Sequence, residues 1–202
     1  MPNPFDPLAP TWDDHPDRHQ LADNLIAALR SWAPIQSDWD ILDYGCGTGA
    51  LALQLAPFVR HVLAIDSSRG MLDVLAAKAK AQDLANIECL QIDFETTPPP
   101  QTSCHLIVSA MTLHHLAQIE HVLQAFFQLL IPGGYLALAD LDEEDGSFHG
   151  QRDGVHHHGF NRAHLTDQLA AVGFNAIEFS TVAQRIKHGQ QYPVFLARAR
   201  RP

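Results

Sequence analysis

The spacing of hydrophobic positions changes along the chain and divides it into helix-like and strand-like segments. In residues 17–32, apolar side chains recur every three or four positions, which predicts an amphipathic helix that ends before Pro34. From residue 39 onward, short continuous apolar runs alternate with segments of helical period. The runs predict strands over residues 41–44, 61–66, 87–93, 105–111 and 135–141.

The segments between these runs have the period of helices. One follows Gly49, another begins at Ser67 and Ser68, which are favourable N-cap residues, and a third covers residues 119–131. Continuous apolar strands that alternate with helices indicate a parallel sheet covered on both faces.

The C-terminal part has a different pattern. Asn161 is a candidate N-cap of a further helix, and Gly173 ends that helix. Two strand-like runs follow, over residues 176–186 and 192–199, with a hairpin turn at 188–190. We therefore predict an α/β fold: a doubly wound, Rossmann-like, mostly parallel seven-stranded sheet that ends in an antiparallel hairpin.

Residues 1–37 stand apart from the main domain, residues 38–202. Four prolines among the first ten positions predict an irregular arm before the first helix. The arm and helix either form a lid over a pocket or pack on the edge of the sheet. In a lid, Trp12, His15 and His19 would reach a bound molecule.

Composition narrows the class of protein. The chain has 202 residues, with 13 Lys and Arg against 23 Asp and Glu, a net charge of −10, which disfavours a nucleic-acid partner. Three cysteines without close spacing fit a reducing compartment. No apolar stretch has the length of a membrane span or the pattern of a signal peptide. We expect a cytoplasmic protein with no membrane partner, either a monomer or a homodimer.

The charge is unevenly distributed. Residues 81–151 contain no Lys or Arg but ten Asp and Glu. A site built mainly from this stretch favours neutral or cationic ligands.

The first strand runs into the sequence Asp43-Tyr44-Gly45-Cys46-Gly47-Thr48-Gly49, which opens a helix. Glycines allow a sharp turn and a close approach of the backbone to a ligand. In doubly wound folds, this first turn is where a nucleotide-like ligand docks.

Two further acids follow strands. Asp66, 23 positions after Asp43, is placed to accept hydrogen bonds from both ribose hydroxyls of a nucleoside, although an acid there also stabilises the start of the next helix. Asp93 and Phe94 end the third run, where the carboxylate can bind an exocyclic amine and the ring can cover a base. Asp93 is alternatively a plain turn residue.

With these residues the chain resembles the class I S-adenosylmethionine-dependent methyltransferases. Its glycine pattern is G-x-G-x-G led by an acid, not the G-x-G-x-x-G of NAD enzymes. The Leu-Ile-Pro-Gly-Gly of residues 130–134 and the terminal hairpin agree with the family, so the resemblance covers about residues 38–199. It implies S-adenosylmethionine as cofactor and S-adenosylhomocysteine as product.

The resemblance also implies a role for each cofactor residue. The glycine loop and its acid would hold the methionine portion, Asp66 the ribose, and Asp93 with Phe94 the adenine. Met71 either packs on the other side of the adenine or belongs to the core, and Cys46 fits a small packing residue. The cofactor residues assigned in this way are Asp43, Gly45, Cys46, Gly47, Gly49, Asp66, Ser67, Met71, Asp93, Phe94 and Ala110.

The candidate catalytic residues are His114, His115 and Asp140, at the ends of the fourth and fifth predicted strands. A Leu-His-His sequence occurs at this place in small-molecule members of the family, and the amino-methylating motif Asn/Asp-Pro-Pro-Tyr/Phe is missing. The two histidines either face the site or have a structural role. Asp140, at a strand end, is the acid that we place in the pocket.

A histidine-rich stretch lies downstream, with His149, His156, His157, His158 and His164 beside a run of carboxylates. Such residues can ligate a metal, hold a substrate, or lie on the surface. Adjacent residues of an extended segment point to opposite faces, so at most two of the three consecutive histidines converge. No metal ligand is assigned.

We therefore expect a methyltransferase that acts on a neutral or cationic small molecule by in-line transfer. A nicotinamide-dependent oxidoreductase shares the doubly wound sheet, but the glycine spacing and the hairpin count against it. A non-catalytic binder of S-adenosylmethionine or S-adenosylhomocysteine would be distinguished by turnover with an acceptor. A metal-binding protein would be distinguished by its metal content.

Overall fold

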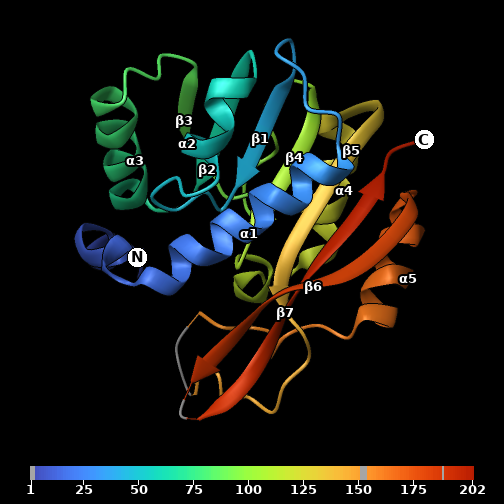
Figure 1. Ribbon diagram of the computed structural model, residues 1–202. Helices are drawn as coiled ribbons and strands as arrows, with labels where there is room; N and C mark the ends of the chain where they lie inside the picture. Colours follow the sequence, from blue (N-terminus) through green and yellow to red (C-terminus); the bar gives the residue numbers. More distant parts are fainter. Residues whose placement is uncertain (1–2, 151–153, 188) are drawn as a thin grey trace.

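The computed structural model of the protein describes residues 3–150, 154–187 and 189–202. At its centre is a seven-stranded sheet with the order β3-β2-β1-β4-β5-β7-β6 (Figure 1). The strands are β1 (Asp40–Tyr44), β2 (His61–Asp66), β3 (Ile87–Gln91), β4 (Cys104–Ala110), β5 (Leu130–Leu141), β6 (Asn175–Lys187) and β7 (Gln190–Arg200).

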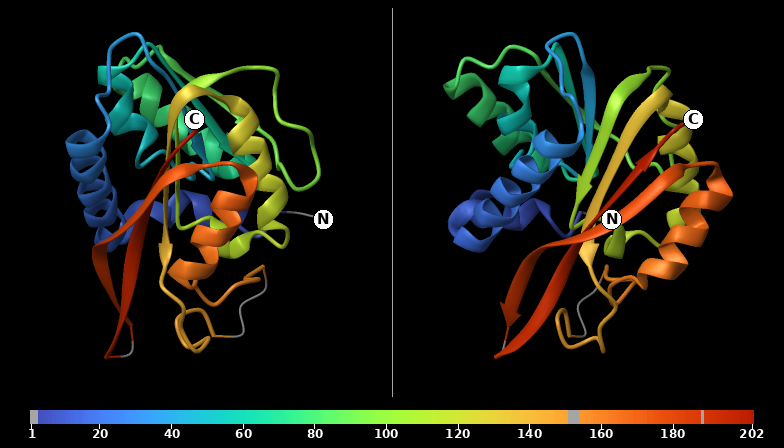
Figure 2. Two further views of the ribbon diagram at one scale, coloured as in Figure 1. Left: turned by 90° about the vertical axis from the view of Figure 1, so that its right-hand side faces the viewer. Right: turned by 45° about the vertical axis from the view of Figure 1, so that its right-hand side comes forward.

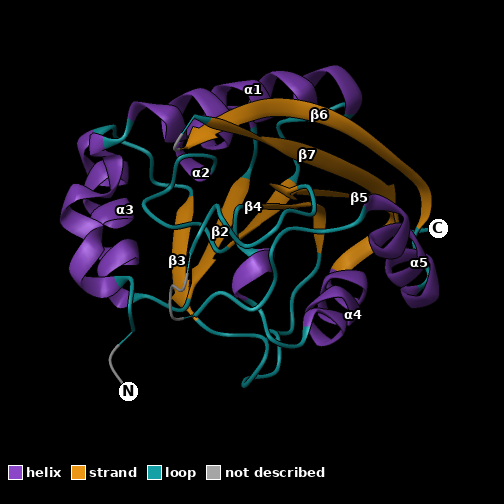
Figure 3. Ribbon diagram, turned by 90° about the horizontal axis from the view of Figure 1, so that it is seen from below, coloured by secondary structure: helices purple, strands orange, loops and turns teal. Residues whose placement is uncertain are grey.

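The first five strands are parallel, and the last two are not. β1 pairs with β2 and β4, β2 with β3, and β4 with β5, all in parallel register. β7 lies antiparallel between β5 and β6. This confirms the predicted mostly parallel sheet and its terminal hairpin. The carboxyl ends of the parallel strands meet at one edge, which Figure 3 shows from below.

Helices cover both faces of the sheet (Figure 2). The chain supplies α1 (Pro16–Trp32), α2 (Ala52–Leu55) and α3 (Arg69–Ala81) to one face, and α4 (Ile119–Leu129) and α5 (Arg162–Val172) to the other. Strand side chains alternate between the two cores: in β2, Val62 and Ala64 pack on one side, Leu63 and Ile65 on the other. Burial on both faces explains why these strands are continuously apolar.

Two element ends differ from the predicted ones. β3 stops at Gln91, two residues early, and β5 begins at Leu130, where the sequence predicted the end of a helix. Leu130 pairs with Cys104, and the register then shifts before Leu106 pairs with Tyr135. Gly133, with φ of 76°, lies inside this irregular strand instead of ending a helix.

The arm before α1 is helical, which corrects the predicted irregular segment. It forms a 3₁₀ helix, η1 (Asp6–Asp14), which packs against α3. Proline near the start of a helix costs no hydrogen bond, because the first N–H groups have no partner within the helix. The Asp6 carboxylate anchors the arm by accepting hydrogen bonds from Ser68 Oγ at 2.6 Å and Gly70 N at 3.0 Å.

The three cysteines are free thiols, with Cys46 and Cys104 buried. Burial raises the pKa of both buried thiols, so they stay protonated at neutral pH and behave as packing residues. Within the described ranges, no helix has the length and apolar character needed to cross a membrane.

Candidate active site

A cavity of about 670 Å³ lies at the carboxyl edge of the parallel strands. One side of it is made by the glycine loop after β1 and the ends of β2 and β3. The other side is made by the ends of β4 and β6 and the loop after β5, and η1 and α1 form its wall. This is the edge at which doubly wound folds bind ligands.

The glycine loop has the backbone that its sequence requires. Gly45, Gly47 and Gly49 all have positive φ, at 68°, 53° and 88°. A Cβ on Gly45 would lie 2.2 Å from Thr112 Oγ1. A Cβ on Gly47 would project into the cavity, where its first neighbour is Trp12 Nε1 at 3.8 Å. Gly47 is therefore the position where a ligand can approach the backbone most closely.

Gly49 has a different role from the one assigned to it. Its missing Cβ leaves room for Leu75 Cδ1, which would be 2.1 Å away, and Gly49 does not line the cavity. This glycine allows the loop to pack on α3.

Two acids stand behind the loop. Asp43 is buried and accepts a hydrogen bond from Ala52 N at 3.1 Å, and burial raises its pKa to about 7. Asp66 lines the cavity, and its two carboxylate oxygens accept hydrogen bonds from Gly47 N and Ser68 N, each at 2.8 Å. Burial raises the pKa of Asp66, although these amides oppose the shift. The amides fix the orientation of this carboxylate, and each oxygen retains a lone pair for a ligand hydroxyl.

The remaining cofactor candidates divide into cavity residues and one core residue. Those that line the cavity are Cys46, Ser67, Met71, Asp93 and Ala110. Phe94 does not: its ring is buried 4.7 Å from the ring of Tyr44 and also contacts Phe126. The interpretation of Phe94 as a cover for the adenine is therefore corrected, because the side chain after the acid turns into the core.

His114 and Asp140 form a buried pair. His114 Nδ1 lies 2.7 Å from Asp140 Oδ1, and the two side chains are 2% and 0% exposed. Asp140 also accepts hydrogen bonds from the backbone N–H groups of His114 and Leu141. With Nδ1–H donated to the carboxylate, the His114 Nε2 is left as an acceptor. His114 lines the cavity and Asp140 does not, so Asp140 stands behind the histidine and not in the pocket as predicted.

Two more histidine rings pack at a tilt beside that of His114. The ring centres of His115 and His149 are 4.1 and 4.5 Å from that of His114, and all three residues line the cavity. His149 Nε2 is buried and has no hydrogen-bond partner among the described residues. Burial and the neighbouring His114 lower the pKa of His149 to about 3, so its ring is neutral.

The consecutive histidines do not enter the cavity. The backbone N–H groups of His156 and His157 donate to the His114 carbonyl oxygen, and the His158 ring faces Glu144 at 3.7 Å. Within residues 3–150, 154–187 and 189–202, no three His, Cys, Asp or Glu side chains are grouped as metal ligands. The segment 151–153 lies outside the described residues.

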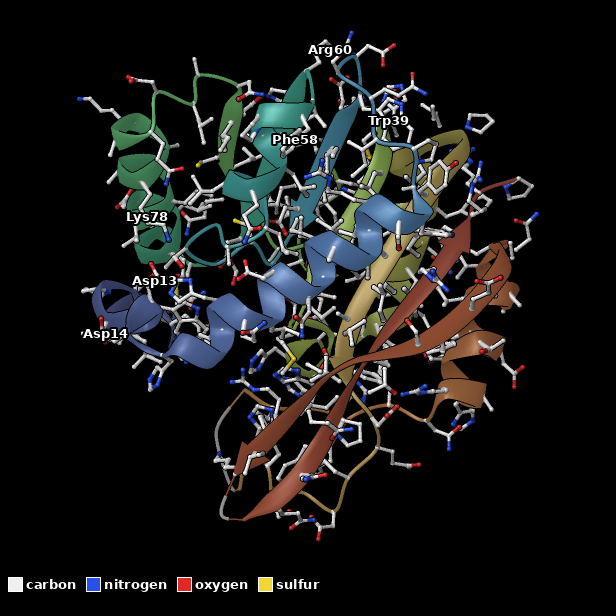
Figure 4. The ribbon with its side chains drawn as sticks, viewed as in Figure 1. Asp13, Asp14, Trp39, Phe58, Arg60 and Lys78 are labelled. Carbon is white, nitrogen blue, oxygen red and sulfur yellow. The ribbon has the colours of Figure 1, made fainter. Side chains whose placement is uncertain are left out.

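The N-terminal arm lies along the cavity. Figure 4 shows Asp13 of η1 beside Lys78 of α3. The Asp13 carboxylate accepts hydrogen bonds from Lys78 Nζ at 2.7 Å and from Thr48 Oγ1 of the glycine loop at 2.6 Å. Burial opposes ionisation of Asp13, but these bonds outweigh it and lower its pKa. The predicted contact residues of the arm, Trp12, His15 and His19, line the cavity.

The cavity also contains residues that the sequence did not suggest. Arg18 of α1 and Arg185 and Lys187 of β6 line it, together with Phe5 and Phe148. The expectation of a neutral or cationic ligand depended on residues 81–151, which contain no cation. These three cations come from the two ends of the chain, which only the tertiary fold brings together.

Comparison with known proteins agrees with this geometry. Residues 41–134 match the family model described as a methyltransferase domain. An uncharacterized methyltransferase of Schizosaccharomyces pombe is 30% identical over 151 residues, which is 68% of this chain and 52% of that protein. The ubiquinone biosynthesis O-methyltransferase of Acinetobacter baylyi is 29% identical over 149 residues, 71% of this chain and 63% of that one.

Solved structures show the same fold. A S-adenosylmethionine-dependent methyltransferase from Aquifex aeolicus superposes with a TM-score of 0.70 at 22% identity, covering 92% of this chain and 94% of that one. Residues 41–134 therefore form a methyltransferase domain, and the fold of the chain is that of a S-adenosylmethionine-dependent methyltransferase. The chain spans less than two thirds of the length of the two curated relatives above.

The residues present fit S-adenosylmethionine, the cofactor that the resemblance in sequence implies. Gly47 leaves the loop backbone open where a Cβ would project into the cavity, and the Asp66 carboxylate is held at the cavity wall. Asp43, Asp66 and Asp93 surround the same end, which suits a ligand carrying a sulfonium and an ammonium group.

Proposed function

We propose that this protein transfers a methyl group from S-adenosylmethionine to a small molecule. One observation carries the proposal: a single cavity joins the glycine loop and Asp66 to the buried His114–Asp140 pair. The first half of the cavity suits the cofactor and the second half an acceptor. A nicotinamide-dependent dehydrogenase is disfavoured by the G-x-G-x-G spacing of the loop and by the antiparallel hairpin at the end of the sheet.

In this proposal the cofactor supplies an electrophilic methyl group on a sulfonium. Asp66 would hold the ribose hydroxyls, Asp93 the adenine, and the glycine loop with Asp43 the methionine portion. Met71 and Ala110 would contact the bound molecule from two sides. Buried walls would exclude water, which leaves positioning of the acceptor as the main task of the protein.

The His114–Asp140 pair suits an acceptor that loses a proton, such as a hydroxyl. His114 Nε2 would take that proton as the bond from the acceptor atom to the methyl carbon forms and the bond from sulfur to that carbon breaks. Asp140 would hold the ring orientation and stabilise the imidazolium. His115 and the neutral His149 would orient the acceptor next to it.

A turnover assay tests the proposal. The purified protein is incubated with S-adenosylmethionine and a panel of small phenols, enols and amines, and S-adenosylhomocysteine is quantified. We expect at least one acceptor to raise its formation well above the rate without acceptor. Binding of S-adenosylhomocysteine without turnover of any acceptor would favour the non-catalytic binder instead.

We further propose that residues 1–37 act as a lid on the domain formed by residues 38–202. The support is the double attachment of Asp13, to Thr48 in the glycine loop and to Lys78 on α3. Trp12 beside Gly47 would then cover the cofactor.

Replacing Asp13 by Ala should speed the dissociation of S-adenosylhomocysteine about fivefold, because a partly buried ion pair and a hydrogen bond together contribute on the order of 1 kcal/mol. Stopped-flow displacement measures this rate. Asp14→Ala is the matched control, since its exposed neighbouring carboxylate lies outside the cavity. Equal dissociation rates for the two variants would argue that the arm only packs on the domain.

A further inference from the structure

The acceptor half of the cavity carries a cationic wall on β6. Arg185 and Lys187 are two positions apart on this strand, so their side chains share one face; Ile186 between them is 67% exposed and also borders the cavity. Both cations line the cavity. Arg185 Nη1 is buried and has no hydrogen-bond partner among the described residues. A buried guanidinium nitrogen without an acceptor is costly; Arg198 Nε on β7 is also without one among the described residues, but Arg185 lines the cavity, where a bound anion can accept from it.

This wall belongs to the acceptor side and not to the cofactor side. β6 is the edge strand, separated from β1 and its glycine loop by β4, β5 and β7. Arg185 pairs in register with Tyr192, whose ring lies 5.0 Å from that of Phe148. The Phe148 ring in turn lies 4.7 Å from that of His149, which packs beside His114.

Lys187 approaches the same group of rings. Its Nζ donates a hydrogen bond to the Phe148 carbonyl oxygen and lies 5.1 Å from the centre of the Phe148 ring. An ammonium group has two further donors, so Lys187 can share an anion with Arg185. The hairpin of β6 and β7 extends past the ends of the parallel strands beside the loop after β5 (Figure 1).

Most charges in the cavity are segregated; the exception is Arg18 of α1, whose guanidinium lies 3.6 Å from the centre of the Trp12 ring on η1. The lining acids are Asp13, Asp43, Asp66, Asp93 and Glu95, all on η1, β1, β2 or the segment after β3. The cations of β6 lie across the cavity from them. A positive sulfonium and a negative acceptor group would therefore each meet the opposite charge.

We infer that Arg185 and Lys187 bind an anionic group of the methyl acceptor, a carboxylate or a phosphate, while its reacting atom lies at His114. The inference rests on the proposed function and adds the substrate class. The acceptor is a two-ended molecule: its reacting end is neutral and meets the cation-free ends of β4 and β5, and its far end is an anion. A guanidinium presents parallel N–H donors that match either oxyanion.

Titration calorimetry with three phenyl probes tests this inference. Benzoate, phenyl phosphate and the uncharged benzamide are titrated into the protein, with and without S-adenosylhomocysteine. We expect an anionic probe to bind about tenfold or more tightly than benzamide, because charge-assisted hydrogen bonds exceed neutral ones. The anionic probe that binds more tightly shows whether the acceptor carries a carboxylate or a phosphate. Equal binding of all three probes, or binding of none at millimolar concentration, would overturn the inference.

Variants locate the anion. Arg185→Gln and Lys187→Gln should each reduce the preference for the anionic probe several-fold, while the affinity for S-adenosylhomocysteine stays within twofold of wild type, as order-of-magnitude expectations for losing one charged contact. Arg198→Gln is the matched control, since Arg198 pairs with Glu178 on the same two strands and lies outside the cavity. Melting temperatures verify that each variant is folded.

Two outcomes separate this inference from the proposed function. If Arg185→Gln weakens the binding of S-adenosylhomocysteine as much as that of benzoate, the guanidinium binds the carboxylate of the cofactor. The inference is then wrong, while the proposed function stands. If the wild-type protein binds an anionic probe but not S-adenosylhomocysteine, the proposed function fails and the anion site stands.

Discussion

Replacing Asp66 by Ala is expected to weaken the binding of S-adenosylhomocysteine about a hundredfold. A hydrogen bond to a charged acceptor contributes about 1.5–3 kcal/mol, so losing two ribose hydroxyl contacts costs about 3 kcal/mol in affinity. The amides of Gly47 and Ser68 also lose the carboxylate that they hold, which loosens the loop. Titration calorimetry measures the dissociation constant directly.

Two further variants make this result interpretable. Asp66→Asn keeps one acceptor oxygen, so its affinity for S-adenosylhomocysteine should fall about tenfold, to a value between those of Asp66→Ala and wild type. Asp73→Asn removes a carboxylate from the exposed surface of α3, where it pairs with Arg69, and this variant should bind the ligand normally. If Asp66→Ala bound the ligand within threefold of wild type, Asp66 would have no role at the ribose.

Replacing His114 by Gln should lower kcat by about 10²–10⁴-fold, the usual contribution of a positioned general base. Affinity for S-adenosylhomocysteine should not change, because His114 lines the part of the cavity that we assign to the acceptor. The assay is steady-state turnover of the acceptor found in the screen.

Asp140→Asn provides a second variant of the same pair. An amide in place of the carboxylate can donate to Nδ1 and force the other tautomer, so kcat should fall while the ring stays in place. His121→Gln, an exposed histidine on α4, is the control for a surface imidazole. Full activity of both His114→Gln and Asp140→Asn would mean that the acceptor needs no base from this pair.

Local pattern was sufficient to predict the fold. The apolar period distinguished strands from helices because strands buried on both faces have no polar positions between their ends, as in residues 62–65 of β2. Asn161 and Gly173 bounded α5 as predicted, since the Asn161 side chain caps the N-terminus and Gly173 adopts φ of 115°. The pattern failed at η1 and at the start of β5, where proline and glycine were interpreted as chain breaks and tertiary contacts decided otherwise.

The two halves of the site differed in how far sequence could predict them. The residues that we assign to the cofactor lie in the β1–loop–α2 unit and directly after β2 and β3. Because the carboxyl ends of parallel strands meet at one edge of the sheet, their positions in the sequence were enough to bring most of them together. Phe94 was misplaced because a sequence does not show which way a side chain leaves a strand end. Asp140 was correctly predicted to lie at the carboxyl edge of the sheet, but it lies behind His114 and not in the cavity.

The acceptor half depended on long-range contacts. Arg18 and Arg185 are separated by most of the chain, and only the antiparallel return of β6 beside α1 places both on one cavity. The count of charged residues over 81–151 therefore described only part of the residues that line the cavity. The sequence placed His149 in a histidine-rich stretch. Its burial beside the His114 ring, with an Nε2 that has no partner among the described residues, could be seen only in the structure.

Parallel calorimetric titrations with S-adenosylmethionine, S-adenosylhomocysteine and NADH test the central claim most directly. Both sulfur ligands should bind saturably at one site per chain, and NADH should not bind. Binding of NADH, or failure of a folded protein to bind either sulfur ligand, would contradict the account.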